Sequence, residues 1–172
     1  KIIYIWMLKN STYKKKIWDT SVLSARVISW ILNIDIILNN STFDFKKNFL
    51  GCIITQTNHL KKNIRFENDY TKKLEIITSI ILSGLVFKEY EENYKLGISE
   101  LESLVKKIFD IKGFPLSRNP SDLIFFLKYL ILCKEVIKDS QKYIPEFLED
   151  IIEKNIICLN FIKTPNKQLP LF

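Results

Sequence analysis

The sequence predicts an all-α fold built from antiparallel helical hairpins. Apolar residues recur at helical spacing along most of the 172 residues, and residues that favour helix N-caps precede several of these stretches. The chain has only four glycines and shows no βαβ alternation. The chain is long enough to form one domain with a hydrophobic core, and 47% of its residues are hydrophobic. Simple bundles, α-solenoids and α/α toroids share this pattern, and no fixed repeat period chooses among them.

Three long helices are predicted in the first half of the chain. The first spans residues 19–38 and has N-cap candidates at its first two positions. The second spans residues 42–64, with apolar side chains at helical spacing. The third spans residues 69–87 and is almost wholly apolar after Leu74, which predicts burial on most sides. Isoleucine-rich stretches in these segments have β-propensity, but their lengths and caps favour helix.

The second half of the chain predicts three more helices. An amphipathic helix spans residues 99–109, and the letters "SELE" at its start predict a capping box from Ser99 to Glu102. After a loop, further helices are predicted at residues 121–138 and 145–162.

The loop and helix start "GFPLSRNPSDLIFF" cover residues 113–126. Asn119 is a good N-cap, Pro120 fits the first helical position and Asp122 suits the positive end of the helix dipole. Capping does not explain Arg118, which adds positive charge beside that positive end. Two interpretations of Arg118 stay open: a solvated loop residue, or a contact to an anion held at the helix N-terminus.

The net charge of +7 suits an acidic partner, which could be nucleic acid, anionic lipid or an acidic polysaccharide. The excess of Ile, Lys and Asn is also typical of AT-rich genomes, so many lysines are expected simply to cover solvated helix faces. Nucleic-acid binding would need basic residues clustered on one face with free aromatics. Here the basic residues are spread over every helix, so no nucleic-acid partner is predicted.

Cofactor and membrane-span signals are also missing from the sequence. The three cysteines are far apart and the only histidine is His59, which predicts buried free thiols and no metal site. No P-loop or dinucleotide fingerprint is present, so no cofactor is predicted. The most apolar long segment, residues 22–38, carries Arg26 and Asp35, so no membrane span is expected.

Several short stretches occur in an order found in a known family. They are "WDTSVLSARVISWIL", which contains Trp18, Arg26 and Trp30, then "QTNHLKKNIRF", "LEIITSIILSGLVF", "ELESLVKKIF", "SRNP" and a final "LPLF". This order resembles the N-terminal helical domain of heparinase II/III-like proteins, especially the alphaproteobacterial branch. The resemblance covers nearly the whole chain, and "SRNP" is its most specific part.

The resemblance implies that residues 1–172 are a fragment: an α/α toroid whose following β-sandwich lyase domain is missing here. It implies β-elimination in a uronate-containing acidic polysaccharide such as a glycosaminoglycan, with the fragment alone inactive. In that reaction the uronate carboxylate is neutralised, a base removes the C5 proton and an acid protonates the leaving oxygen. Arg118 and Asn119 would neutralise the carboxylate, while Arg118, Ser117, Trp18 and Arg26 would bind substrate. A bacterial periplasm or cell envelope is the favoured location, with the cytoplasm as the alternative.

The chain departs from the family pattern at two places. Relatives carry Asp-Gly-Gly-His-x before "SRNP", whereas this chain has Pro115 at the histidine position. The Asn-His pair of the better-known heparinase branch would fall at Thr71 and Lys72, and the pair Asn58-His59 lies too far upstream to take its role. A non-catalytic module that binds acidic glycans, or an unrelated basic helical protein that binds nucleic acid, therefore remain alternatives.

Two structural expectations accompany these hypotheses. Trp30 and Phe49 are predicted to lie in the core, while Trp6 and Trp18 either pack or stack on sugar rings. A partial toroid should leave an exposed apolar edge where its missing partner packs. Arg118 is expected at the mouth of a concave surface, with its side chain directed into it.

Overall fold

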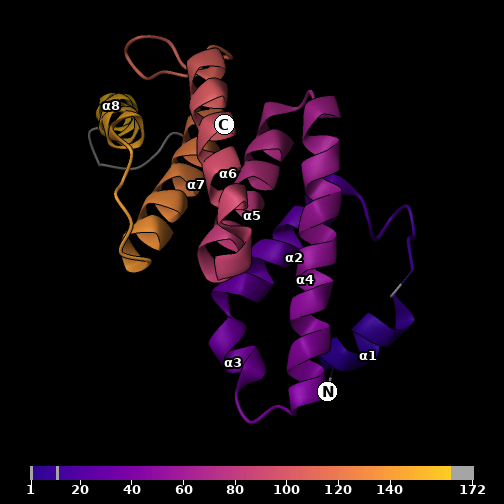
Figure 1. The fold of residues 1–172 in the computed structure, drawn as a ribbon. Helices are drawn as coiled ribbons and strands as arrows, with labels where there is room; N and C mark the ends of the chain where they lie inside the picture. The colour runs from indigo at the N-terminus through magenta and orange to yellow at the C-terminus, as the bar shows by residue number, and fades with distance from the viewer. Residues whose placement is uncertain (1, 11, 164–172) are drawn as a thin grey trace.

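The chain folds into an all-α structure, as the sequence predicted. The computed structural model describes residues 2–10 and 12–163, in which the only extended pairing is an isolated bridge between Phe109 and Pro115. The α-helices are α1 (Ile2–Lys9), α2 (Thr20–Leu32), α3 (Ile34–Leu38), α4 (Phe43–Asn63), α5 (Tyr70–Val86), α6 (Glu91–Ile108), α7 (Pro120–Asp139) and α8 (Glu146–Ile162), with 3₁₀ turns η1 (Ile64–Phe66) and η2 (Lys88–Tyr90) (Figure 1).

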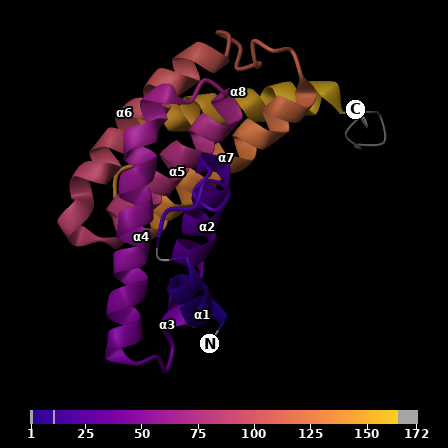
Figure 2. The same cartoon turned by 90° about the vertical axis from the view of Figure 1, so that its right-hand side faces the viewer.

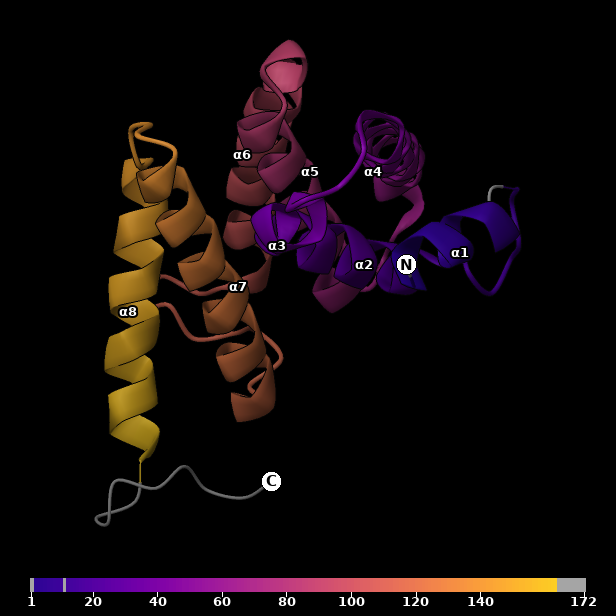
Figure 3. The same cartoon turned by 90° about the horizontal axis from the view of Figure 1, so that it is seen from below.

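Helix α5 is the centre of the fold. It packs against α2, α4, α6 and α7, and every side chain from Ile76 to Gly84 is buried. The burial predicted for residues 69–87 is therefore confirmed, because a helix that is apolar on all sides is stable only when neighbours cover all of them. In Figure 3 the helices follow one another across the molecule, from α1 at one edge through α5 and α6 to α8 at the other.

Side-chain N-caps position four of the helices, including the caps expected from the sequence at Asp19 and Asn119. Asp19 accepts a hydrogen bond from the Ser21 N–H at 3.1 Å, and Thr42, Asp69 and Asn119 cap α4, α5 and α7 in the same way. Each cap satisfies a backbone donor that the first helical turn leaves unpaired. These side chains fix where the helices begin, and hence where the loops carrying the candidate site residues lie.

Two predicted boundaries are wrong. The segment 19–38 is not one helix: α2 stops at Asn33, whose side-chain amide donates to the Ser29 carbonyl at 2.8 Å, and α3 starts after it. The capping box predicted at Ser99 does not form, because α6 already begins at Glu91 and Ser99 lies inside it. Gly97 lies inside α6. Because it has no side chain, the helix can pack directly on Ile81 of α5 at this point.

The outer pair α7 and α8 holds the loop between α6 and α7 (residues 109–119). The Asn155 side chain of α8 donates to the Gly113 carbonyl at 2.6 Å. Gly113 has a φ of +82°, and a Cβ there would lie 2.4 Å from Lys154 Cβ, so glycine is required for both conformation and space. Figure 2 shows this loop and α8 at the same end of the molecule.

Residues at the two edges of the fold expose large apolar side chains. On α8 and the neighbouring loop these are Ile157, Phe161 and Ile111, and on α1 they are Ile2, Ile5 and Leu8. Phe49 is fully buried in the core, as predicted, whereas Trp30 is only partly buried and packs against the core, with 5.2 Å between its ring centroid and that of Phe49.

As the sequence predicted, none of the helices among the described residues is both long enough and apolar enough to cross a lipid bilayer.

Candidate functional site

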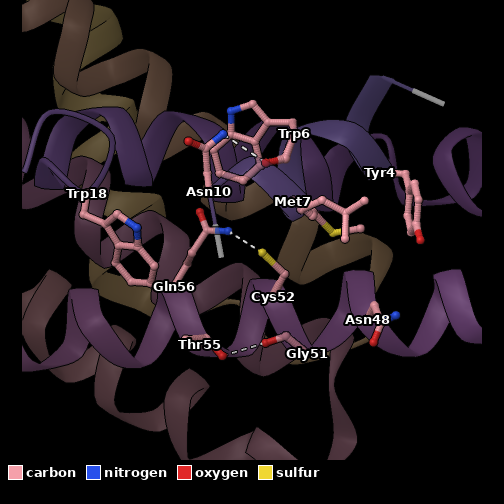
Figure 4. A pocket seen from close by; sticks show the side chains of 11 residues that line it. Tyr4, Trp6, Met7, Asn10, Trp18, Asn48, Gly51, Cys52, Thr55 and Gln56 are labelled. Carbon is pink, nitrogen blue, oxygen red and sulfur yellow. Dashed lines mark hydrogen bonds between the residues drawn. The ribbon is translucent and has the colours of Figure 1, made fainter. Parts of the chain in front are cut away.

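A pocket with a volume of about 370 Å³ lies between α1, the segment before α2, and α4; it is called the α1–α4 pocket below. Trp6, Asn10 and Trp18 line one side of it, and Asn48, Cys52 and Gln56 of α4 line the other (Figure 4). Apolar walls with a few polar groups are typical of small-molecule binding sites.

The local sequence explains why these side chains converge. Asn48, Cys52 and Gln56 are four residues apart, so they lie on one face of α4. Gly51, beside them, has open space around its missing side chain. Across the pocket, Trp6 packs edge-on against Trp30 of α2 at 5.3 Å, which fixes α1 against the rest of the fold.

Arg26 of α2 is the charged group beside this pocket. Its Nη1 donates to Gln56 Oε1 at 2.9 Å and its Nη2 donates to the Ile17 carbonyl at 3.0 Å. Its guanidinium carbon lies 4.2 Å from the centroid of the Trp6 ring. All these partners are neutral, and no carboxylate of the described residues forms an ion pair with Arg26. Burial lowers the pKa of Arg26, but arginine stays charged at neutral pH. The pocket therefore lies next to a half-buried, uncompensated positive charge.

Trp18 offers a hydrogen-bond donor that nothing in the described chain accepts. Its Nε1 is buried and has no partner, and Figure 4 shows it on the edge of the ring that faces Gln56. The other side of Trp18 packs edge-on against His59 at 5.2 Å. Burial, with a smaller contribution from Lys62, lowers the pKa of His59, so this imidazole is neutral at neutral pH. A buried donor without a partner is costly, and a ligand acceptor in the pocket would relieve that cost.

Cys52 is the thiol of the pocket. Gln56 Nε2 donates to its Sγ at 3.0 Å, and burial raises the pKa of the thiol despite the nearby Arg26. A protonated thiol is a poor nucleophile, so the arrangement favours binding over covalent chemistry here. Among the described residues, no three His, Cys, Asp or Glu side chains come together as a metal site.

The second group of predicted site residues, Ser117, Arg118 and Asn119, lies at the start of α7. Asn119 Oδ1 accepts from the Ser121 N–H at 3.0 Å, and Pro120 occupies the first turn, so the predicted cap is confirmed. Ser117 Oγ donates to Asp122 Oδ2 at 2.6 Å, and Asn119 Nδ2 donates to Asp122 Oδ1 at 3.2 Å. These bonds use the polar side chains of the loop to hold the first turn of α7.

Arg118 has a carboxylate partner in its own loop. Its Nη1 donates to Asp110 Oδ2 at 2.7 Å, while its side chain remains 64% exposed. Asp110 also accepts from the backbone N–H groups of Lys112 and Phe114. Arg118 adopts a φ of +57°, which is uncommon for a residue with a side chain. The positive charge that the cap could not explain is thus balanced by Asp110.

The two groups lie beside different cavities. Trp18 lines the α1–α4 pocket, whereas Ser117 and Asp122 line a cavity of about 440 Å³ with Asp69 and Lys107. The N-termini of α2 and α5 lie between the two cavities. They are joined by a hydrogen bond of 3.2 Å from Thr20 Oγ1 to Glu67 Oε2, and Glu67 is two residues before Asp69. We call this line of helix starts, from α2 through α5 to α7, the N-terminal rim.

Comparison of the chain with protein-family models, with curated proteins and with solved structures gave no match. The resemblance described above therefore depends on the short sequence stretches alone.

The sequence did not reveal the amide side chains of the pocket. The spacing of Asn48, Cys52 and Gln56 was available as a signal of one helix face. The opposite wall of the pocket could not be recognised in the sequence, because α1, which supplies that wall, was not expected to be a helix.

Proposed function

We propose that this chain is the glycan-binding helical domain of a heparinase II/III-like lyase, and that it binds uronate-containing acidic polysaccharide. The observation that carries the proposal is Arg26, a half-buried arginine with only neutral partners beside a pocket lined by tryptophan and amide side chains. A uronate provides the missing carboxylate, and charge-assisted hydrogen bonds to arginine are the strongest that a site of this kind can make.

The rest of the pocket suits a sugar. Trp18 lines the pocket, and its buried Nε1–H has no partner; a ring or hydroxyl oxygen that reached it would satisfy this donor. Asn10 and Asn48 supply amide donors and acceptors of the kind that sugar hydroxyls require, one from each side. Gln56 and Ile17 hold the guanidinium of Arg26 in place beside the pocket.

A longer polysaccharide would continue along the N-terminal rim. The rim leads from the α1–α4 pocket to the second cavity, which Lys107 lines together with Ser117, Asp69 and Asp122. The order of helices from α1 to α8, with exposed apolar side chains at both edges, supports a toroid segment that packs against further structure (Figure 3). The toroid and the following β-sandwich belong to this proposal.

Catalysis by this protein would involve Arg118 and Asn119 as the groups that neutralise the uronate carboxylate. Arg118 would have to exchange Asp110 for the substrate, or bind both carboxylates with its five donors. The base and the acid of the elimination would come from the β domain. The pairing of Arg118 with Asp110, together with Pro115 in place of the histidine, favours a second candidate: a module that binds acidic glycan without cleaving it.

The binding proposal is tested by titrating the chain with a uronate oligosaccharide and with the same oligosaccharide after its carboxylates have been reduced to alcohols. We expect Arg26→Gln to weaken binding of the acidic form by about 1.5–3 kcal/mol, the value of a hydrogen bond to a charged group. The reduced form should bind the parent and the variant equally. Arg65→Gln is the matched control, because Arg65 is exposed in the turn η1 that follows α4.

Asn48→Ala is a second variant that does not depend on the half-buried charge, since Asn48 is exposed and its loss leaves the fold intact. It should weaken binding of both oligosaccharides. Equal affinity of Arg26→Gln and the parent for the acidic oligosaccharide would overturn the proposal. Cleavage is tested in the full-length protein by the ultraviolet absorbance of the unsaturated product, with Arg118→Ala as the variant.

A further inference from the structure

Helix α1 is apolar on both of its faces. One face, with Ile3, Trp6 and Met7, packs against the fold. The other face leaves Ile2 85%, Ile5 47% and Leu8 63% exposed. A helix that is apolar all round is normally covered on all sides, and contiguous exposed apolar side chains usually mark an interaction surface.

The residues that follow α1 are strongly basic. Lys9, Lys14, Lys15 and Lys16 are all exposed, and no aspartate or glutamate precedes Asp19 in the sequence. Lys14 Nζ donates to the Lys9 carbonyl at 2.7 Å, which holds the basic segment against the C-terminal end of α1. Exposed apolar side chains and uncompensated lysines therefore occupy one short stretch of chain.

We propose that the outer face of α1 and these four lysines bind the surface of an anionic phospholipid bilayer, with α1 lying in the plane of the interface. The isoleucine and leucine side chains would enter the boundary of the acyl chains, and the lysines would contact the phosphate and carboxylate groups of the lipids. Tyr4, which is 45% exposed, is of a residue type that favours this interface.

The charge pattern favours a lipid surface over a second copy of the chain. A two-fold interface through α1 would gather eight lysines, four from each copy, around one contact, and no acidic residue precedes Asp19 in either copy to balance them. Helix α8 provides the contrast. It also exposes Ile157 and Phe161, but it carries Glu149, Asp150 and Glu153, which an anionic surface would repel. The proposal does not depend on the glycan site, because Ile2, Ile5 and the four lysines do not line the α1–α4 pocket.

The test is co-sedimentation of the chain with vesicles of phosphatidylcholine containing phosphatidylserine, and with vesicles of phosphatidylcholine alone. We expect binding to the anionic vesicles and much weaker binding to the neutral ones. Changing Lys14, Lys15 and Lys16 together to Gln should reduce the partition coefficient by about a hundredfold, at about fivefold per lysine. Ile2→Ser, at a side chain that is 85% exposed, should reduce it by about tenfold or more. Ile157→Ser, the matched control on α8, should leave it unchanged.

Circular dichroism of each variant checks that these exposed substitutions leave the helices intact. Absence of binding to the anionic vesicles overturns the proposal, and so does an equal loss with Ile157→Ser. If Ile2→Ser instead dissociates a dimer seen by analytical ultracentrifugation, the face binds a second copy and the lipid proposal is wrong. Ile2 does not line the α1–α4 pocket, so Ile2→Ser should not change the affinity for soluble uronate oligosaccharide, and failure of one proposal is distinguishable from failure of the other.

Discussion

Helices α5 and α6 approach each other closely at Gly84. A Cβ added to Gly84 would lie 2.2 Å from the Tyr94 backbone nitrogen and 2.8 Å from the Tyr94 Cα. These are backbone atoms, so a rotamer change cannot remove the clash. We predict that Gly84→Ala forces α5 and α6 apart and destabilises the protein.

The size of the effect follows from comparison with Gly51, which lies inside α4 with no atom within 4 Å of an added Cβ. Alanine gains roughly 0.5–1 kcal/mol over glycine in a helix interior, and this gain applies at both positions. Overpacking typically costs about 1–3 kcal/mol, and we expect the upper end at Gly84 because backbone atoms obstruct the methyl group. Gly51→Ala should therefore stabilise by about 0.5–1 kcal/mol, and Gly84→Ala should destabilise by about 2 kcal/mol.

Urea unfolding followed by circular dichroism measures both free energies, and an unchanged slope of the transition shows that the denatured state is the same. A separation of about 3 kcal/mol between the two variants is expected. If Gly84→Ala is as stable as the parent or more stable, the close contact of α5 and α6 is not as described and the reasoning is wrong.

Three further predictions concern the loop before α7 and the contact between α5 and α7. Asn119→Ala should cost about 1 kcal/mol in urea unfolding through the lost cap, whereas Arg118→Ala should cost less than about 0.5 kcal/mol because its ion pair is largely exposed. The hydrogen bond from the Phe114 N–H, and to a smaller extent Arg118, holds the pKa of Asp110 below its ordinary value of 3.8. The stabilisation by ionised Asp110 is therefore complete above pH 3.8 and is lost as the pH falls through the lowered pKa. In acid titration, Asp110→Asn should lack this pH-dependent loss of stability. Tyr129→Phe should cost about 1.5–3 kcal/mol in thermal or urea melts, because it removes the hydroxyl that donates to Glu75 at 2.8 Å; an unchanged melt would show that this bond is not formed.

Helix starts were the most predictable part of the fold. A cap acts through a side chain and a backbone group two or three residues apart, so Asp19 and Asn119 could be assigned from the sequence alone. The start of α6 could not be assigned in this way, because α6 is positioned by the packing of Gly97 against Ile81, a contact between separate helices. Ser99 begins a sequence typical of a capping box, but it lies inside the helix that this packing positions.

The candidate site was less predictable for a related reason. A sequence shows that an arginine is present but not which carboxylate faces it. Arg118 seemed uncompensated beside a helix N-terminus, yet the turn at Gly113 brings Asp110 back to within 2.7 Å of it. The α1–α4 pocket depends on α1, whose residues are apolar on both faces and therefore show no helical periodicity.

The contrast between Arg26 and Arg118 bears on where a negatively charged ligand binds first. A ligand at Arg118 competes with a carboxylate tethered eight residues away in the same loop, which is always present at high local concentration. A ligand at Arg26 competes with no carboxylate of the described residues, and Arg26 can keep its neutral partners. Arg26 is already partly desolvated in the folded state, so an incoming carboxylate bears only the rest of that cost. An acidic chain is therefore expected to bind at the α1–α4 pocket first and to reach the start of α7 only as it extends along the N-terminal rim.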